Sequence, residues 1–244
     1  MINIILKALN ISKSYDNVKI VDGINISLAK GEVVSLLGES GCGKSTVLNI
    51  LAGLEGPDSG RVLIEGEDTT LKVGKVSYMP QRDLLLPYKN IIDNVSLPLV
   101  LKGEKKGSAR KKALPLFKAF SLEGCEYKYP NELSGGMRQR AAFLRTYLCS
   151  NNIFLLDEPF SALDAITKSK MHRWYLELID KMSISTVLVT HDIDEAIYLS
   201  NRIYIIKGRP AGIVEEIKIE TSSLNGLNES FLHYKNHILQ ILSS

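Results

Sequence analysis

Long apolar runs, which a membrane-spanning protein requires, are absent from the 244 residues of this sequence. A transmembrane helix needs about 18 or more consecutive apolar residues, whereas a strongly apolar run such as 153–156 has only four. The first residues, Met1 to Lys7, lack the charged segment and long apolar stretch of a secretory signal. We therefore expect a soluble chain, for which any membrane association comes through a partner.

Cysteine and net charge are also low. The three cysteines, Cys42, Cys125 and Cys149, lie far apart and form no C-x-x-C pair. This spacing disfavours a disulfide framework or a structural zinc site, and a reducing compartment is expected. The 30 Lys and Arg against 27 Asp and Glu leave a net charge of +3. Because nucleic-acid binding needs a concentrated basic surface, this balance argues against a nucleic-acid partner.

Nothing in the composition indicates disorder or a fibrous protein. Hydrophobic residues make up 45% and charged residues 23%, and the 18 glycines and 8 prolines are close to average usage. At roughly 150 residues per domain, the length predicts one large domain or one with a sizeable insertion.

Short apolar runs separated by turn signals predict buried strands that alternate with helices in a parallel sheet. We expect strands over 32–37, 61–64, 153–156 and 186–189, and helices over 44–52 (with Gly53 as C-cap), 108–121, 134–149 and 231–242. Strand signals fade between about residues 82 and 150. This stretch therefore predicts a helical subdomain inserted into an α/β core.

The strongest motif lies between the first predicted strand and the first predicted helix. It matches G-x-x-x-x-G-K-[ST] and comprises Gly38, Glu39, Ser40, Gly41, Cys42, Gly43, Lys44, Ser45 and Thr46. Glycines let the loop wrap closely, so that backbone N–H groups and the start of the helix face phosphate oxygens. Lys44 is expected to reach the β- and γ-phosphates, and the Ser45 hydroxyl to bind Mg²⁺. The loop predicts a nucleotide site.

Two carboxylates follow the apolar run 153–156, at the carboxyl end of a strand, where α/β sheets place their ligands. Pro159 ends the strand because it cannot continue the ladder. Asp157 suits a role in holding Mg²⁺, and Glu158 suits a base that accepts a proton from an attacking water.

A second anion-binding helix start is predicted at Leu133-Ser134-Gly135-Gly136-Met137-Arg138-Gln139, where Ser134 is a good N-cap and the glycines expose backbone N–H groups. One nucleotide has a single triphosphate, which the first loop already holds. The second anion-binding helix start is explained if it contacts the γ-phosphate of a nucleotide bound by another copy of the chain.

In these motifs the chain resembles the ATPase subunits of ATP-binding-cassette (ABC) transporters over roughly residues 4 to 215, and residues 133–139 resemble that family's signature motif. The resemblance implies that Tyr15 stacks on adenine, that Gln81 senses Mg²⁺ and the attacking water, and that His191 contacts the γ-phosphate. It implies a D-loop at Ser161-Ala162-Leu163-Asp164 that crosses a dimer interface.

The resemblance also implies the site and the fold. Catalytic roles fall to Glu158, His191, Gln81 and Lys44, and Mg²⁺ to Ser45, Gln81 and Asp157; ATP contacts further include Ser134, Gly135, Gly136, Gln139 and Asp164. The implied fold is an α/β P-loop NTPase core with a mostly parallel sheet, an N-terminal antiparallel β region and an inserted helical subdomain. Residues 1–81 and 151–220 would form the core, 82–150 the signature subdomain and 221–244 a helical tail.

Within the family, segments 81–88, 93–95 and 207–213 are most similar to importers of the nitrate/sulfonate/taurine type, although Tyr88 stands where that group often has tryptophan. The implied partners are a second copy, head to tail, a membrane permease and, indirectly, an extracytoplasmic binding protein, with the chain at the cytoplasmic face of the membrane. An importer of a pyrimidine thiamine precursor or another vitamin is the alternative, and a soluble non-transport ABC ATPase is a further one. DNA-repair relatives separate the two motifs by long coiled coils, whereas Lys44 and Ser134 are 90 residues apart.

Two further features carry alternatives. The basic stretch from Lys102 to Lys112 is expected to be a solvated helix face, with contact to anionic lipid or nucleic acid as the alternative. His233 and His237 are four residues apart on the predicted terminal helix, a spacing that can bind a metal. Packing of that helix on its own domain is the expected arrangement.

Overall fold

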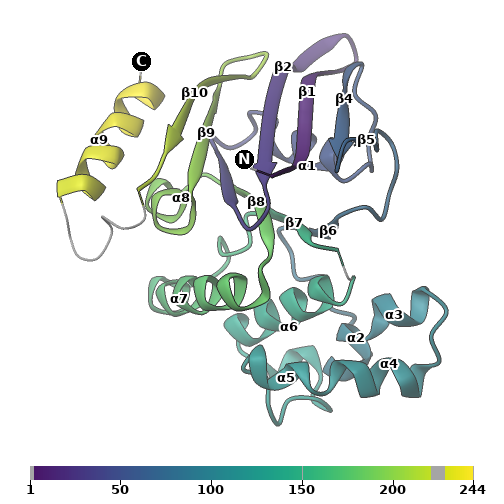
Figure 1. Ribbon diagram of the computed structural model, residues 1–244. Helices are drawn as coiled ribbons and strands as arrows, with labels where there is room; N and C mark the ends of the chain where they lie inside the picture. Colours follow the sequence, from purple (N-terminus) through teal and green to yellow (C-terminus); the bar gives the residue numbers. More distant parts are fainter. Residues whose placement is uncertain (1–2, 150, 221–228, 244) are drawn as a thin grey trace. The chain divides into compact units, whose positions relative to one another are not determined.

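The structure is a computed structural model that describes residues 3–149, 151–220 and 229–243. The chain folds into two compact units. Described residues up to 75, together with those from 183 onward, form one unit, which we call the sheet unit. Residues 76–182 form the other, which we call the helical unit (Figure 1).

The sheet unit contains an antiparallel sheet in the order β2-β1-β4-β5. Its strands are β1 (Ile4–Tyr15), β2 (Val18–Ala29), β4 (Ser59–Ile64) and β5 (Glu67–Asp68). A two-residue turn joins β1 to β2, and both of its residues, Asp16 and Asn17, have positive φ (48° and 63°). Asp and Asn tolerate this left-handed conformation, and a tight turn of this kind fits the twist of a hairpin.

A second group of strands in the sheet unit is mostly parallel. β3 (Val33–Leu37) pairs in parallel with β8 (Ser185–Thr190) and with β9 (Arg202–Lys207), and β10 (Gly212–Lys218) adds antiparallel to β9. All residues of β3 and β8 are buried, as expected for parallel strands. Helices α1 (Lys44–Leu51), α8 (Ile193–Leu199) and α9 (Glu229–Ser243) belong to this unit. α9 packs through the fully buried Ile238 on a cluster that includes Ile205 and Ile217.

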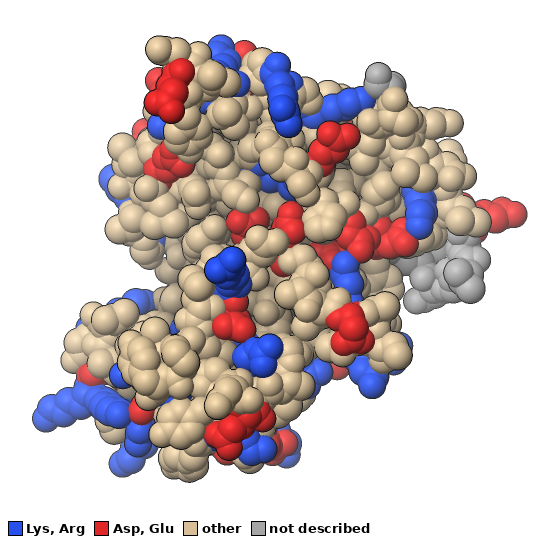
Figure 2. Space-filling model, turned by 180° about the vertical axis from the view of Figure 1, so that it is seen from behind, with Lys and Arg blue, Asp and Glu red and all other residues tan. Residues whose placement is uncertain are grey.

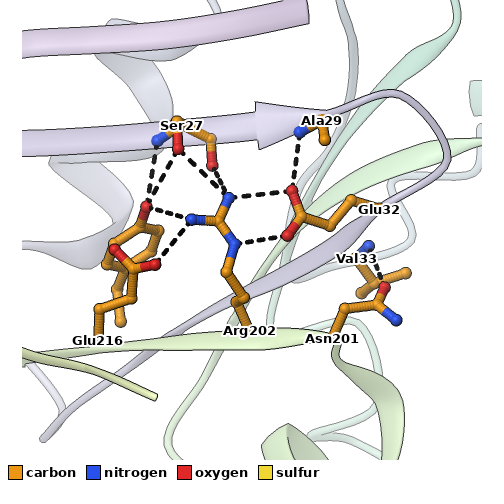
Figure 3. Close-up of polar contacts among 8 residues, drawn as sticks. Ser27, Ala29, Glu32, Val33, Asn201, Arg202 and Glu216 are labelled. Carbon is orange, nitrogen blue, oxygen red and sulfur yellow. Dashed lines mark hydrogen bonds and ion pairs between the residues drawn. The ribbon is translucent and has the colours of Figure 1, made fainter. Parts of the chain in front are cut away.

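A half-buried arginine fixes the start of β3. Arg202, on β9, forms a two-pronged ion pair with Glu32 (Nε–Oε1 2.5 Å, Nη2–Oε2 2.9 Å) and also binds Glu216 on β10 at 2.9 Å (Figure 3). The same guanidinium donates to the carbonyl of Ser27 on β2, at 2.7 Å. Glu32 in turn accepts from the backbone N–H of Ala29 at 2.7 Å. The turn that leads into β3 is thus held by β2, β9 and β10.

The helical unit contains one parallel strand pair, β6 (Ser77–Met79) and β7 (Ile153–Asp157). Its helices are α2 (Ile91–Val95), α3 (Leu97–Leu101), α4 (Lys106–Ala113), α5 (Leu116–Ala119), the 3₁₀ helix η1 (Pro130–Glu132), α6 (Gly135–Tyr147) and α7 (Ala165–Met182). An aromatic core joins α6 to α7, because the Phe143 ring lies 5.5 Å from Trp174 and 5.6 Å from Tyr175 between centroids. Such pairs stabilise beyond the area that they bury.

The basic charge of α4 is partly neutralised within the helical unit. Arg110 binds both carboxylate oxygens of Asp93 (2.7 and 2.8 Å), Lys106 binds the same carboxylate at 2.9 Å, and Lys112 pairs with Glu104 at 2.6 Å. Figure 2 shows Lys and Arg side chains projecting at the lower left, at the end of this unit that carries α3 and α4. The basic stretch is a solvated helix face with internal ion pairs.

Most elements expected from the sequence are confirmed within about two residues. A single helix over 108–121 is wrong: Pro115, which has no backbone N–H, lies between α4 and α5. No strand occurs among the described residues of 82–150. Of the predicted tail over 221–244, residues 221–228 and 244 lie outside the described residues, and α9 occupies 229–243. The boundaries 1–81, 82–150 and 151–220 stay predictions.

None of the helices in the described part of the chain combines the length and the apolar character that crossing a membrane requires.

Candidate functional site

The glycine loop between β3 and α1 is shaped by close backbone packing. A Cβ on Gly38 would collide with the carbonyl of Ile206. Gly43 has φ +100°, and a Cβ there would lie 2.7 Å from Cγ1 of Val21. Only glycine satisfies both demands without strain. The loop therefore holds its course through its main chain, and successive main-chain N–H groups in a loop of this kind can bind an anion.

Lys44 is buried inside this loop, with 4% of its surface exposed. Its ammonium donates to the carbonyls of Gly38 (2.8 Å) and Glu39 (2.7 Å), and it stands at the first position of α1. A helix start carries partial positive charge, which adds to that of the lysine. Loop, lysine and helix start together form an arrangement that could hold phosphate groups, and Ser45 and Thr46 continue the first turn of α1.

Tyr15 lies beside this loop at the end of β1. Burial and a hydrogen bond with Glu55 raise the pKa of its phenol, against a smaller lowering by a hydrogen bond with Thr46. The ring is 42% exposed, and the ammonium of Lys13 lies 5.5 Å from its centroid. An exposed aromatic face next to the loop suits a planar base, and the adenine contact stays a prediction.

His191 follows β8 directly. Because Leu37 of β3 pairs in parallel with Thr190 of β8, Gly38 and His191 leave neighbouring strands at the same edge of the sheet. His191 is exposed, and the next residue, Asp192, caps α8 by accepting from the N–H of Glu195 at 3.1 Å. The tertiary structure thus places the histidine at the same sheet edge as the glycine loop.

In the helical unit, a second parallel pair gathers Gln81 and the two carboxylates. Met79 of β6 pairs with Leu156 of β7, so that the residues after both strands lie at one edge. Nε2 of Gln81 donates to Oε2 of Glu158 at 3.2 Å and to Oγ of Ser161 at 3.4 Å. This pair can orient a water molecule and take its proton.

Asp157 ends β7 and is 8% exposed. The hydroxyl of Tyr78 donates to its Oδ2 at 3.5 Å. Burial, followed by the negative charge of Asp157, raises the pKa of Tyr78 to about 12. The phenol of Tyr78 therefore stays neutral at physiological pH and can donate its hydrogen bond to the Asp157 carboxylate.

The predicted second helix start is formed as expected. Ser134 caps α6, with its hydroxyl accepting from the N–H of Met137 at 3.3 Å. A Cβ on Gly136 would lie 2.9 Å from Cγ2 of Thr167, so α6 and α7 approach closely here. Gln139 donates to the carbonyl of Pro159, and Asp164 caps the first turn of α7 at the N–H of Thr167 (3.0 Å).

A groove of about 510 Å³ connects the start of α6 with the segment after β6. It is lined by Gln81, Arg82, Asp83, Gly135, Arg138, Gln139, Ser161, Ala162 and Leu163. The helical unit thus brings together Gln81, Glu158, Gly135 and Gln139, while Ser134 and Asp164 serve as helix caps beside the groove. Tyr15, residues 38–46 and His191 belong to the sheet unit.

Comparison with known proteins decides the family. The sequence model of the ABC transporter family matches residues 21–161. The chain belongs to this family. The formylaminopyrimidine import ATP-binding protein ThiZ of Halalkalibacterium halodurans is 43% identical over 82% of this chain and 78% of its own length. The aliphatic sulfonates import ATP-binding protein SsuB of Bacillus cereus is 39% identical over 94% of this chain and 90% of its own.

A solved structure supports the same assignment for this ABC ATPase. The dimeric structure of a post-hydrolysis state of the cassette MJ0796, bound to ADP and Pi, has a TM-score of 0.76 and 32% identity over 88% of this chain and 99% of its own. The predicted mixed α/β fold, with an antiparallel N-terminal sheet and a mostly parallel sheet, is confirmed.

The motifs of this ABC ATPase did not reveal two arginines on α6. Arg145 donates to the carbonyls of Leu84 (2.7 Å) and Asp83, and Nε of Arg138 lies 3.4 Å from Oδ2 of Asp83. Both side chains therefore act on the segment that follows Gln81. The spacing of Arg138 and Arg145 could have indicated a shared contact, because residues seven apart lie two turns along the same face of a helix.

Proposed function

We propose that this chain is the ATP-hydrolysing subunit of an ABC importer, which couples binding and hydrolysis of Mg-ATP to uptake through a separate membrane permease. The buried Lys44 ammonium, held inside a glycine loop at the first turn of α1, carries the proposal. The two relatives described above are import ATP-binding proteins, which supports the importer assignment.

Each proposed role is assigned to a side chain or to a loop. Lys44 and the N–H groups of residues 38–46 bind the phosphates and stabilise the charge that spreads over them during in-line attack. Glu158 accepts a proton from the attacking water, and Gln81, hydrogen-bonded to Glu158, orients that water. His191 positions the γ-phosphate, and Tyr15 stacks on the adenine.

The donors of the chain fit Mg²⁺. This small cation prefers oxygen ligands and is held by one or two carboxylates together with substrate phosphates. The buried carboxylate of Asp157, the amide oxygen of Gln81 and the hydroxyl of Ser45 are such donors. No group of three His, Cys, Asp or Glu side chains that could hold a metal occurs among the described residues. When bound, Mg²⁺ neutralises charge on the phosphate oxygens.

The second helix start supports a head-to-tail homodimer. In this dimer, the γ-phosphate of the ATP held by the glycine loop of one copy would contact Ser134, Gly135 and Gly136 of the other copy, with Gln139 and Asp164 nearby. The dimeric structure of the ADP- and Pi-bound cassette supports dimerisation. Each copy then completes half of the partner's pocket, so that an isolated copy hydrolyses ATP poorly.

The remaining partners follow from the importer assignment. The dimer would bind a permease at the cytoplasmic face of the membrane, and an extracytoplasmic binding protein would deliver the cargo. A small anion such as a sulfonate, taurine or nitrate is the proposed cargo, supported by the sulfonate relative. A formylaminopyrimidine is the alternative, supported by the other relative. Loss of this gene should abolish growth on an alkanesulfonate as sole sulfur source. If it instead abolishes only growth that depends on the formylaminopyrimidine as a thiamine precursor, the alternative is favoured.

Substitution of Glu158 tests the catalytic assignment. Glu158→Gln should lower kcat about 1,000-fold, because the amide cannot accept the proton. ATP affinity should stay within about threefold, and ATP-bound dimers should accumulate in size-exclusion chromatography coupled to light scattering. Glu177→Gln, a change at an exposed position of α7, is the matched control. Hydrolysis by Glu158→Gln at the unchanged rate would contradict the assignment.

A further inference from the structure

The segment that follows Gln81 is held from outside by side chains of α6. Nη1 of Arg145 donates to the carbonyl of Leu84 at 2.7 Å, and Nη2 donates to the carbonyl of Asp83. The Arg145 side chain is half-buried, and burial lowers the pKa of its guanidinium. A partly desolvated charge is stable only where it is hydrogen-bonded, and these two carbonyls supply that requirement.

The backbone at this contact is strained. Leu84 has φ +45°, a left-handed conformation that is unfavourable for a non-glycine residue and persists only where the surrounding structure holds it. The carboxylate of Asp83 accepts from the N–H of Leu85 at 3.0 Å, and its other oxygen lies 3.4 Å from Nε of Arg138. The strained residue is therefore the one that Arg145 holds.

The other end of the segment is fixed by a buried amide. Asn94, fully buried on α2, accepts from the N–H of Leu86 at 2.7 Å and donates to the carbonyls of Leu86 (3.1 Å) and Lys89 (2.9 Å). Because Asn94 fixes the segment at Leu86 and Lys89, the contact of Arg145 sets the conformation of the two or three residues next to Gln81.

We propose that Arg145 is a positioning residue for ATP hydrolysis: its hydrogen bonds to the carbonyls of Asp83 and Leu84 fix the backbone after Gln81 and keep the Gln81 amide on the Glu158 carboxylate. This inference rests on the proposed roles of Gln81 and Glu158. The planar guanidinium suits the task because its fork reaches two adjacent carbonyls at once, whereas an ammonium is a point donor without that fixed geometry.

Hydrogen exchange tests the positioning itself. In Arg145→Gln we expect the amides of Leu85 and Leu86 to exchange at least about tenfold faster, because the strained turn opens more often. Arg140→Gln is the matched control: Arg140 lies on the same helix and is half-buried, but it contacts Met171 (3.3 Å) and the Trp174 ring (5.2 Å) of α7. Unchanged exchange at 85–86 in Arg145→Gln, or an equal increase in Arg140→Gln, would overturn the inference.

A kinetic cycle tests the consequence for hydrolysis. Gln81→Ala and Arg145→Gln should each lower kcat about tenfold with KM within about twofold, and the double variant should be no more than about twofold slower than Gln81→Ala. Arg145→Lys, which keeps the charge and can reach one carbonyl, should recover about one third of the lost rate. A merely structural role would not give this dependence on Gln81.

The two arms separate the inference from the function on which it rests. If Gln81→Ala keeps its full kcat, the proposed role of Gln81 fails, while the exchange experiment still decides whether Arg145 holds the segment. If Gln81→Ala is slow and the double variant loses the product of the two single effects, Arg145 does not act through Gln81 and the inference is overturned.

Discussion

The two units of this ABC ATPase arrange their candidate functional residues in different ways. In the sheet unit, the phosphate site that we propose consists of nine consecutive residues (38–46), with main-chain groups and one buried lysine. In the helical unit, the surroundings of Gln81 are assembled from β6, α6 and the residues after β7. A contiguous backbone site is visible in the sequence, whereas a site of dispersed side chains appears only once the chain has folded.

This contrast has a physical origin. A backbone site needs unusual φ angles and close approach, which glycine permits and which a short motif therefore encodes. A side-chain site needs several elements to pack in register, so its partners, such as Arg145 and Leu84, lie 61 residues apart.

Glycine substitution in the loop should have the largest effect. In Gly43→Ala, a Cβ would meet the side chains of Ile20 and Val21, at a φ of +100° that alanine rarely adopts. We expect ATP to bind roughly 100-fold more weakly, about 2.7 kcal/mol, as measured by isothermal titration calorimetry. Cys42→Ala, one residue earlier, should change affinity by less than about threefold. Equal losses in both variants would refute a site made by the main chain.

The ion pairs of Arg202 test how much the stability of the fold depends on contacts between side chains that are far apart in the sequence. Burial lowers the pKa of Arg202, but its hydrogen bonds with Glu32 and Glu216 outweigh this and raise it above the usual range. Arg202→Leu leaves the half-buried Glu32 without its ionic partner, so urea denaturation should show a loss of about 3 kcal/mol. Glu216→Ala, which removes a more exposed partner, should lose less than about 1 kcal/mol. A comparable loss in both would show that burial is not the deciding factor.

The smallest effect concerns Asp93 in the helical unit. Hydrogen bonds from Arg110 and, more weakly, Lys106 hold the pKa of Asp93 below its usual value. Because the folded-state pKa is the lower one, the pairing stabilises the fold above about pH 4 and is lost as pH falls through that pKa. Asp93→Asn should therefore cost about 1 kcal/mol at pH 7 and very little near pH 2, by urea denaturation at each pH. Asp180→Asn, at an exposed position of α7, should show no such pH dependence.

Local sequence patterns predicted the elements that carry strong local signals. The helix after the glycine loop begins at Lys44 and ends one residue before its predicted end, with Gly53 at φ +71°. Patterns of apolar residues do not reveal α7, although it has 18 residues, because its buried positions are sparse and its N-terminal cap, Asp164, lies in a segment that resembles a loop motif. Nor did they separate α4 from α5, where one proline decides the outcome.

By itself, the sequence determined the glycine loop, the ends of β7 and β8 to within one residue, and the capped start of α6, since glycine, proline, serine and short apolar runs act over a few residues. The tertiary structure decided what depends on distant partners: Arg202 on Glu32 across 170 residues, and Arg145 on the carbonyls beside Leu84. Hydrogen bonds between segments that are remote in the sequence form only after apolar packing has brought those segments together. A local sequence pattern therefore does not predict to which carbonyl an arginine will donate.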